Sequence, residues 1–166
     1  MIYVTVGTHE QSFDRLVRAV DALKADGTIT EEVIIQIGYS TYVPQHCTWQ
    51  KLFPYQDMVR YMDEARIVIT HGGPSSFLAP LRSGKVPVVV PRQLRYGEHV
   101  NDHQLEFCRE VSQRSRNILL VEDVAQLRDV LTRYDELAAA CSVGTASNNA
   151  AFNDHFCRIV ADLLEA

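Results

Sequence analysis

Long apolar runs, a leading cationic segment and an excess of basic residues are all missing from this sequence. No apolar run approaches the roughly 20 residues that a membrane-spanning helix needs, and the run 86–90 contains Pro87 and is followed by Pro91. The chain begins Met-Ile-Tyr-Val, so we expect no secretory signal and a cytoplasmic protein. The 16 Lys and Arg residues are outnumbered by 21 Asp and Glu residues, for a net charge of −5. This balance disfavours non-specific binding to nucleic acid.

Cysteine is also scarce, and its spacing excludes the common cysteine-based sites. The chain has four cysteines, Cys47, Cys108, Cys141 and Cys157, and no Cys-x-x-Cys pair. Zinc sites and disulfide frameworks usually show close, paired spacings. We therefore expect reduced thiols that are mostly buried, and neither a structural metal nor a cofactor.

Glycine motifs that would identify other enzyme classes are absent. Gly7 stands alone after the first expected strand, which excludes a Gly-x-Gly-x-x-Gly dinucleotide fingerprint, and no Gly-Lys-Ser/Thr loop occurs. The triplet His71-Gly72-Gly73 is like an esterase oxyanion loop, but the chain has no Gly-x-Ser-x-Gly nucleophile elbow. A serine hydrolase is therefore disfavoured.

The composition and pattern that are present predict one α/β domain over residues 1–166. Hydrophobic residues make up 46% and charged residues 22%, which is ordinary for a folded protein. Short β-branched runs alternate with amphipathic stretches, as in βαβ units. We predict a single Rossmann-like domain with an open, mostly parallel sheet of about six strands, at residues 2–6, 33–37, 49–53, 67–70, 86–90 and 118–121. The predicted helices are one that ends at Gly27, one at 57–65, one that begins near Pro74, one at about 101–114, one that follows Asp123 and a C-terminal one at 148–165.

Polar residues cluster after three of these strands, where the ligands of parallel sheets bind. The first cluster is 7–10, with Gly7, Thr8 and His9, the second is 71–76, and the third lies within 92–104. Glycines let a backbone approach a ligand closely, and serines at a helix start offer hydroxyl and N–H donors. The second cluster suits a diphosphate, although an ordinary glycine turn with serine caps explains it equally well.

Three histidines in these loops admit more than one interpretation. His9 follows a strand end. Its imidazole either serves as a base or as a hydrogen-bond donor to a phosphate, or it is only part of the turn. His99 and His103 are four residues apart, so on a helix they would share a face. They are candidate metal ligands, members of a polar cluster that faces a ligand, or a solvated helix start. Two ligands alone do not make a metal site.

Three ordered motifs give the sequence a resemblance to a known family. They are Val-Thr-Val-Gly-Thr-His-Glu at 4–10, Ile-Thr-His-Gly-Gly-Pro-Ser-Ser-Phe at 69–77, and Val-Pro-Arg-Gln at 90–93 with Tyr-Gly-Glu-His-Val-Asn-Asp-His-Gln at 96–104. Together they resemble the C-terminal, donor-binding half of the GT-B glycosyltransferases of family 28. The resemblance is strongest to short bacterial subunits of exopolysaccharide and capsule glycosyltransferases of the PssE type.

The resemblance implies a uridine diphosphate sugar as donor and assigns roles to residues. The glycine-rich loop 72–76 would hold the diphosphate, and 101–104 would lie against the sugar. A glutamate that other family members use for the ribose is replaced here by Ala79. His9 is our candidate catalytic residue. The expected substrate-binding residues are Gly7, Thr8, His71, Gly72, Gly73, Pro74, Ser75, Ser76, Glu98, Asn101, Asp102, His103 and Gln104.

The resemblance also implies a partner, because a GT-B site lies between two such domains and this sequence supplies one. A separate, membrane-attached subunit would bind a lipid-linked saccharide acceptor and bring this chain to the inner face of the plasma membrane. The pair would transfer a hexose. Phe152, Phe156, Ile159 and Leu163 of the C-terminal helix either help to dock that partner or pack on the sheet. The alternatives are a non-catalytic enhancer of a partner transferase and an independent enzyme of another nucleotide-sugar reaction, such as epimerisation.

Overall fold

The computed structural model describes residues 1–141 and contains one six-stranded sheet in which all strands are parallel. The strand order is β3-β2-β1-β4-β5-β6. This confirms the predicted α/β class and the number of strands, whereas the C-terminal helix expected at 148–165 lies outside the described residues. The strands are β1 (Ile2–Thr5), β2 (Val33–Gln36), β3 (Thr48–Gln50), β4 (Ile67–His71), β5 (Val88–Val90) and β6 (Leu119–Leu120).

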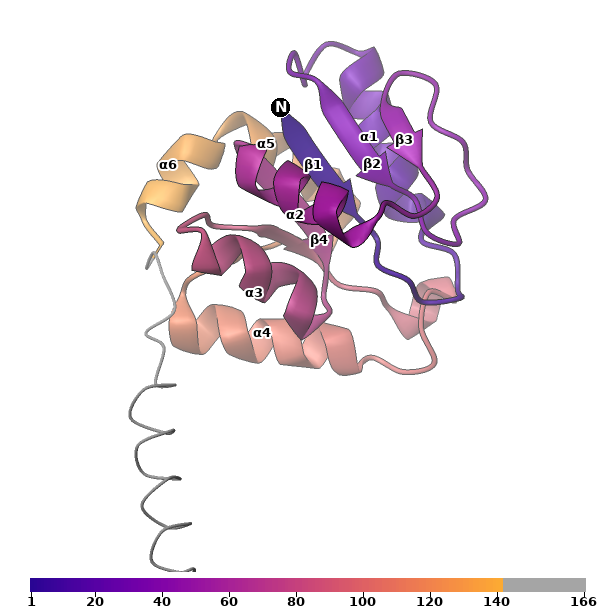
Figure 1. The fold of residues 1–166 in the computed structure, drawn as a ribbon. Helices are drawn as coiled ribbons and strands as arrows, with labels where there is room; N and C mark the ends of the chain where they lie inside the picture. Colours follow the sequence, from indigo (N-terminus) through magenta and orange to yellow (C-terminus); the bar gives the residue numbers. More distant parts are fainter. Residues whose placement is uncertain (142–166) are drawn as a thin grey trace, which may run out of the picture.

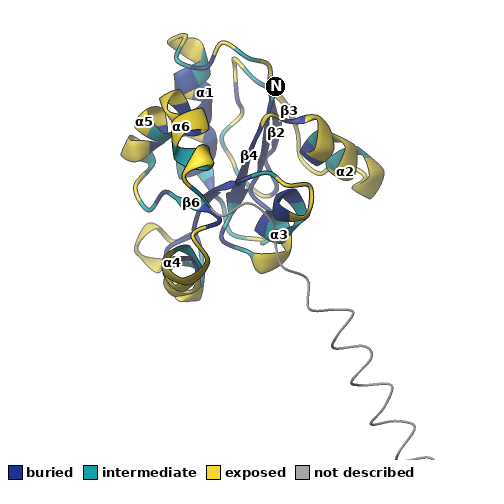
Figure 2. Cartoon of the chain, turned by 90° about the vertical axis from the view of Figure 1, so that its left-hand side faces the viewer, coloured by how far each residue is buried: buried dark blue, intermediate teal, exposed yellow. Residues whose placement is uncertain are grey.

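Helices cover both faces of the sheet (Figure 1). On one face, α1 (Asp14–Ala25), α5 (Leu127–Thr132) and α6 (Tyr134–Ala139) pack against alternate strand residues such as Val4. On the other, α2 (Tyr55–Glu64), α3 (Pro74–Arg82) and α4 (His103–Ser115) pack against residues such as Tyr3 and Val89. The inner strands β1, β4 and β5 and their neighbour β2 are consequently buried on both sides, whereas β3 at the sheet edge is exposed and the helices expose their outer surfaces (Figure 2). Burial on both faces explains why the strands read as continuous apolar runs.

The order of the strands fixes where a ligand can enter. The chain places β2 and β3 on one side of β1, and β4, β5 and β6 on the other. Thr5 of β1 pairs with Thr70 of β4, so the loops that follow these two strands begin side by side. Such a reversal of strand order opens a crevice beyond the carboxyl ends of the strands. The motifs at 7–9 and 71–76 both lie there.

Prolines account for several shifts from the predicted boundaries. β5 begins at Val88 rather than at residue 86, because Pro87 has no N–H to give to a strand ladder. α2 begins at Tyr55, directly after Pro54, and the predicted strand 49–53 is instead the exposed edge strand β3 at 48–50.

The segment after β5, where the sequence predicts a polar cluster within 92–104, is partly buried. Pro91, Arg92 and Gln93 are buried, and a short 3-10 helix, η1 (Leu94–Tyr96), follows them. The Arg92 side chain contacts the loop after β1, and that of Gln93 donates to the carbonyl of Glu122. Residues 94–97 are exposed.

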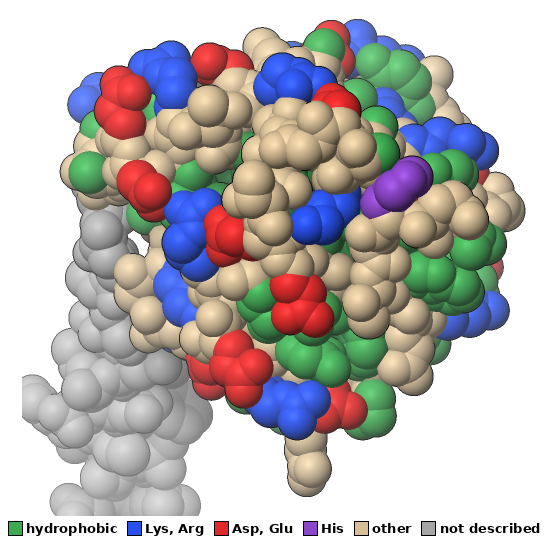
Figure 3. All heavy atoms as spheres, turned by 90° about the horizontal axis from the view of Figure 1, so that it is seen from above, with side chains coloured by type: hydrophobic (Ala, Val, Ile, Leu, Met, Phe, Trp, Pro, Cys, Tyr) green, Lys and Arg blue, Asp and Glu red, His purple; other side chains and the backbone are tan. Residues whose placement is uncertain are grey.

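The opposite end of the molecule, where β1 begins, carries a mixed charged surface. Seen from this end, acidic and basic side chains are interspersed (Figure 3). Arg66, whose N–H donates to the carbonyl of Met1, contacts Glu31 and Asp135, and Arg128 contacts Asp26. Within residues 1–141, no helix has both the length and the apolar character needed to cross a membrane.

Candidate functional site

His71 separates two of the loops at the crevice. A Cβ atom added to Gly7 would lie 2.5 Å from Cε1 of His71, and one added to Gly73 would lie 2.5 Å from its Nε2. The imidazole is therefore held between the loop after β1 and the loop after β4. Burial, followed by the charge of Arg92, lowers the pKa of His71 to about 4, so its ring is neutral at pH 7. The structure thus places His71 as a spacer between loops.

Gly72 is closely packed as well, but against α4. A Cβ atom there would lie 2.9 Å from Sγ of Cys108 and 3.1 Å from Cβ of Gln104. Gly72 and Gly73 have no positive φ, unlike Gly7. Sequence reasoning linked the glycine pair to a ligand, whereas the structure supplies an internal cause, the close approach of His71 and α4. Burial raises the pKa of the Cys108 thiol to about 12, which makes it unreactive.

Two hollows lie on either side of the loop 72–76. The first has a volume of about 250 Å³ between this loop and the start of α4, and is lined by Gly72, Pro74, His99, Asn101, His103, Gln104 and Phe107. The second has a volume of about 380 Å³ between α2 and α3, and is lined by Tyr55, Met58, Val59, Met62, Ser75, Ser76, Ala79 and Arg82. The expected residues Gly72 to Ser76, Asn101, His103 and Gln104 thus gather around one loop.

Hydrogen bonds orient the polar side chains near the first hollow. The backbone N–H of Arg92 donates to Oε1 of Gln104 (3.2 Å), which leaves the Gln104 amide group as a donor toward the hollow. Oδ1 of Asn101 accepts from the N–H of His103 (3.2 Å) at the start of α4. Asp102, in contrast, accepts from the N–H of Leu94 (2.8 Å) and lines neither hollow. The Asn101 side chain therefore holds the helix start, and Asp102 holds η1.

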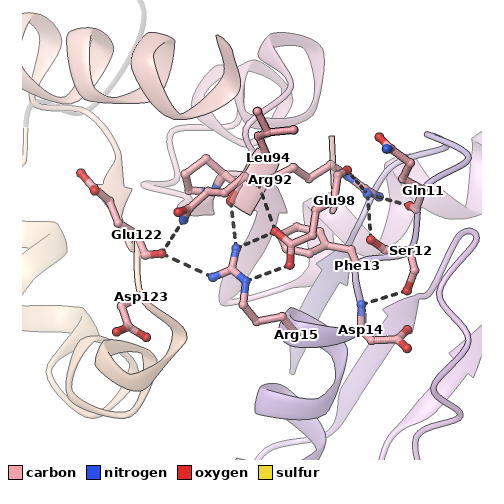
Figure 4. A network of polar contacts seen from close by, with 12 residues as sticks. Gln11, Ser12, Phe13, Asp14, Arg15, Arg92, Leu94, Glu98, Glu122 and Asp123 are labelled. Carbon is pink, nitrogen blue, oxygen red and sulfur yellow. Dashed lines mark hydrogen bonds and ion pairs between the residues drawn. The ribbon is translucent and has the colours of Figure 1, made fainter. Parts of the chain in front are cut away.

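Glu98 is placed in the interior and away from both hollows. The residue is 3% exposed, and its two carboxylate oxygens accept from Nε (2.8 Å) and Nη2 (2.9 Å) of Arg15 in α1. It also accepts from the N–H of Gln93 (3.2 Å). Figure 4 shows this pair facing each other between the loop after β5 and α1. Glu98 was expected to bind substrate, but its contacts make it an anchor of this loop.

His9 and His99 form a pair that the sequence did not predict. Their ring centroids are 4.7 Å apart, although the residues belong to the loops after β1 and β5. Nδ1 of each ring accepts from the backbone N–H two residues later, at 3.2 Å from Gln11 and 3.4 Å from Asn101. Neutral rings in this arrangement carry their proton on Nε2. Burial, then His99 and Arg92, lowers the pKa of His9, which keeps it neutral.

The remaining expected residues lie on the rim of the site. Thr8, with His9, Glu10 and Tyr39, lines a third, shallow hollow beside the imidazole pair. His99 and His103 line the first hollow together, and within residues 1–141 no three His, Cys, Asp or Glu side chains form a group able to hold a metal ion. The metal interpretation of this histidine pair has no support in the described part of the chain.

Sequence reasoning missed Tyr55, Phe107 and Arg92. Tyr55 is 77% exposed, and its position after Pro54 at a helix start was the available signal. Phe107 lies on the exposed side of α4 with its ring 6.0 Å from that of Phe77. Arg92 belongs to a motif that was noted, but nothing in its sequence environment indicated that it is buried.

Comparisons with known proteins agree with the fold and the motifs. Residues 1–151 match the model of the glycosyltransferase family 28 C-terminal domain. The chain is 33% identical over 119 residues to the human UDP-N-acetylglucosamine transferase subunit ALG13, which covers 66% of this chain and 10% of that protein. It is 28% identical over 148 residues to zeaxanthin glucosyltransferase from Pseudescherichia vulneris, covering 84% of this chain and 35% of that enzyme.

Solved structures show the same fold in longer chains. The glycosyltransferase SnogD from Streptomyces nogalater superposes with a TM-score of 0.54 at 17% identity, and the spinosyn forosaminyltransferase SpnP with 0.58 at 14%. Each match covers 84% of this chain and 36% of the solved chain. The chain thus spans between a tenth and about a third of the length of these proteins. The match over residues 1–151, together with the fold, shows that the chain belongs to the glycosyltransferase family 28 C-terminal domain family.

Proposed function

We propose that this domain binds a uridine diphosphate sugar and acts as the donor-binding half of a glycosyltransferase. The observation that carries the proposal is the pair of hollows on either side of the loop 72–76. A nucleotide sugar has three consecutive parts, a nucleoside, a diphosphate and a sugar. The groove between α2 and α3 suits the nucleoside, the loop suits the diphosphate, and the polar hollow beside α4 suits the sugar.

The loop and α3 offer an electrostatic role at the diphosphate. Pro74 has no N–H, and the N–H of Ser76 donates to the carbonyl of Gly73 (3.0 Å). The N–H groups of Gly73 and Ser75 are therefore the donors that we assign to phosphate oxygens, together with the positive end of the nine-residue helix α3. Such donors stabilise negative charge on a leaving diphosphate, at several kcal/mol in other enzymes.

Histidine and glutamine side chains complete the proposed donor site. Gln104 and His103 would contact sugar hydroxyls in the first hollow. Because Nδ1 of His9 already accepts a hydrogen bond, we assign its Nε2–H as a donor to a phosphate oxygen. His9 remains our candidate for local acid or base chemistry. Ala79 lies in the groove where a carboxylate would reach a ribose, so we assign that contact to the hydroxyls of Ser75 and Ser76.

We further propose that the domain works with a second, acceptor-binding subunit. The human relative is named as a subunit of a UDP-N-acetylglucosamine transferase, and the three motifs resemble the PssE-type bacterial subunits. On this proposal the partner is membrane-attached, binds a lipid-linked saccharide, and holds this chain at the inner face of the plasma membrane. The product would be an exopolysaccharide or capsule precursor that carries one added hexose. The alternative is a non-catalytic enhancer subunit, which the missing ribose carboxylate at Ala79 favours.

Calorimetry on the full chain with UDP, ADP and UDP-sugars tests donor binding. We expect UDP to bind more tightly than ADP. Tyr55→Ala should weaken the binding of UDP and of UDP-sugar alike, by about tenfold if the ring stacks on the base. His103→Ala should weaken the binding of the UDP-sugar only. Leu52→Ala removes an exposed apolar side chain outside both hollows and serves as control. A folded chain that binds neither ligand at millimolar concentration would contradict the proposal and leave the enhancer role.

A further inference from the structure

Arg92 is a fully buried arginine at the meeting point of two site loops. Its exposed fraction is 0%, although arginine is rarely buried without a partner of opposite charge. Nη2 donates to the carbonyl of Val6 (2.8 Å), and Nη1 donates to those of Gln11 (2.7 Å) and Glu98 (3.1 Å). The guanidinium also lies 4.8 Å from the centre of the Phe13 ring (Figure 4). These contacts join the loop after β1 to the loop after β5.

The hydrogen-bond acceptors of Arg92 are neutral carbonyl groups. The nearby carboxylate of Glu98 pairs with Arg15 instead, at 2.8 Å. Among residues 1–141, no carboxylate lies within ion-pair distance of Arg92, and its buried Nε has no hydrogen-bond partner. Burial lowers the pKa of Arg92 to about 10, so the side chain is still charged at pH 7. The Glu98 carboxylate opposes this effect of burial only in part, and a buried charge without an ion-pair partner reduces stability unless something compensates it.

The position of this charge relates it to the site. The backbone N–H of Arg92 orients Gln104, which lines the first hollow. Val6 immediately precedes Gly7, and Gln11 holds the ring of His9. The positive charge of Arg92 contributes to the lowered pKa values of both His9 and His71. The charge of Arg92 thus acts on residues of the loops after β1 and β4.

We propose that Arg92 is a positioning residue that also supplies the fixed positive charge of an anion-binding site at these loops. Its guanidinium holds the loops after β1 and β5 together through backbone carbonyls, and its charge is compensated when an anionic group binds above it. The identification of that group as a diphosphate rests on the proposed function. The observation that a buried charge without an ion-pair partner lies beside these loops does not depend on the proposed function.

The test compares two arginines of the same segment that differ in burial. Arg92→Gln and Arg95→Gln remove the same formal charge, but Arg95 is exposed and stacks on Tyr96. We expect Arg92→Gln to weaken the binding of UDP about tenfold or more, because a buried charge is poorly screened. The affinity for uridine, which carries no phosphate, should change less than twofold. Arg95→Gln should change UDP affinity less than threefold. Arg92→Lys, which keeps the charge, should retain most of the preference for UDP over uridine.

The titration of His9 gives a readout that needs no ligand. Followed by NMR, His9 should titrate below its ordinary value in the wild-type chain, and its pKa should rise in Arg92→Gln. His99 and Arg92, from the loop after β5, lower the pKa of this ring, and Glu10 raises it. His71, after β4, is the other titratable group coupled to it. Because Arg95→Gln leaves the buried charge in place, it should leave this titration unchanged.

The outcomes separate this inference from the proposed function. A wild-type chain that fails to bind UDP contradicts the proposed function, while the His9 titration still decides whether the charge acts at the loops. An equal loss of affinity for UDP and for uridine in Arg92→Gln would show a merely structural role of Arg92 and overturn the inference. If Arg92→Gln does not fold, a selective loss of UDP affinity relative to uridine in Arg92→Lys, which keeps the charge, or a wild-type His9 pKa at or above its ordinary value, would overturn it instead.

Discussion

At the scale of single residues, the glycines of the loop 72–76 illustrate how one pattern can have two physical causes. Glycine was expected there so that the backbone can approach a ligand. The structure shows that Gly73 leaves room for the ring of His71, and that Gly72 leaves room for Cys108 and Gln104. The loop is therefore shaped by internal packing, and the proposed donor would bind a surface that this packing has already formed.

Gly73→Ala should destabilise the domain through contact with His71. The added Cβ would lie 2.5 Å from Nε2, so the ring must move, at a cost of about 1–3 kcal/mol. His71→Ala in the same chain should remove most of that additional cost. Urea unfolding of the two single variants and the double variant measures the coupling. Additive effects would show that His71 does not limit this position.

At the scale of elements, two aspartates of α1 hold the loop that follows β2. Asp14 accepts from the N–H (2.7 Å) and the hydroxyl of Thr41, and Asp21 accepts from the N–H groups of Gln45 (3.0 Å) and His46 (2.8 Å). These aspartates are seven residues apart, so they lie two turns apart on one helix face. The loop, which lacks helix or strand of its own, is thereby fixed beside β3.

Asp21→Asn should lower the stability of the domain below that of the wild type at neutral pH. This difference should become smaller at low pH. Burial alone would raise the pKa of Asp21, but hydrogen bonds from Gln45, Tyr42 and His46 outweigh it and lower the pKa to about 2. The stabilisation is therefore complete above the ordinary pKa near 3.8 and is lost as pH falls toward 2. We expect a difference of up to about 2 kcal/mol at pH 7.

Denaturant unfolding at several pH values checks the Asp21 prediction. Asp57→Asn is the matched control, because Asp57 is half-exposed and pairs with Arg60 one turn away (3.0 Å). Pairs of this kind contribute little, about 0.5 kcal/mol or less. A constant difference between Asp21→Asn and the wild type from pH 7 to pH 2 would contradict a role for the ionised carboxylate.

At the scale of the whole molecule, the candidate site lies on one edge of a single α/β domain. Apolar side chains around the hollows remain exposed there, among them Tyr55 (77%) and Val100 (69%). A closed, water-poor site favours transfer of charged groups, and this edge requires a covering surface to become one. A second domain facing these loops would supply it.

Sugar transfer should therefore require the proposed partner even though donor binding does not. The isolated chain should bind UDP-sugar, and transfer to a lipid-linked acceptor should appear only after the acceptor-binding subunit is added. A radiolabelled-sugar transfer assay, with and without that subunit, measures this difference. His103→Ala in the complex should reduce transfer, whereas Leu52→Ala should not. Equal transfer by the isolated chain would contradict a divided active site.

The sequence by itself determined the α/β class, the six parallel strands and the three loops at the crevice. These features follow from local pattern, because apolar runs of strand length and glycines after them are visible along the chain. Boundaries near Pro54 and Pro87 were less well predicted. At Pro87 an apolar run continues through a residue that cannot join the ladder, and at Pro54 a helix begins directly after the proline.

Only the tertiary structure decided which polar residues line the hollows and which hold the loops. Glu98 was grouped with the substrate-binding residues, and its ion pair joins it to Arg15, 83 positions earlier in the chain. The imidazole pair His9–His99 and the burial of Arg92 likewise depend on contacts between loops far apart in the sequence. Sequence spacing carries no information about such pairs, because parallel strands bring their loops together only after the sheet has formed.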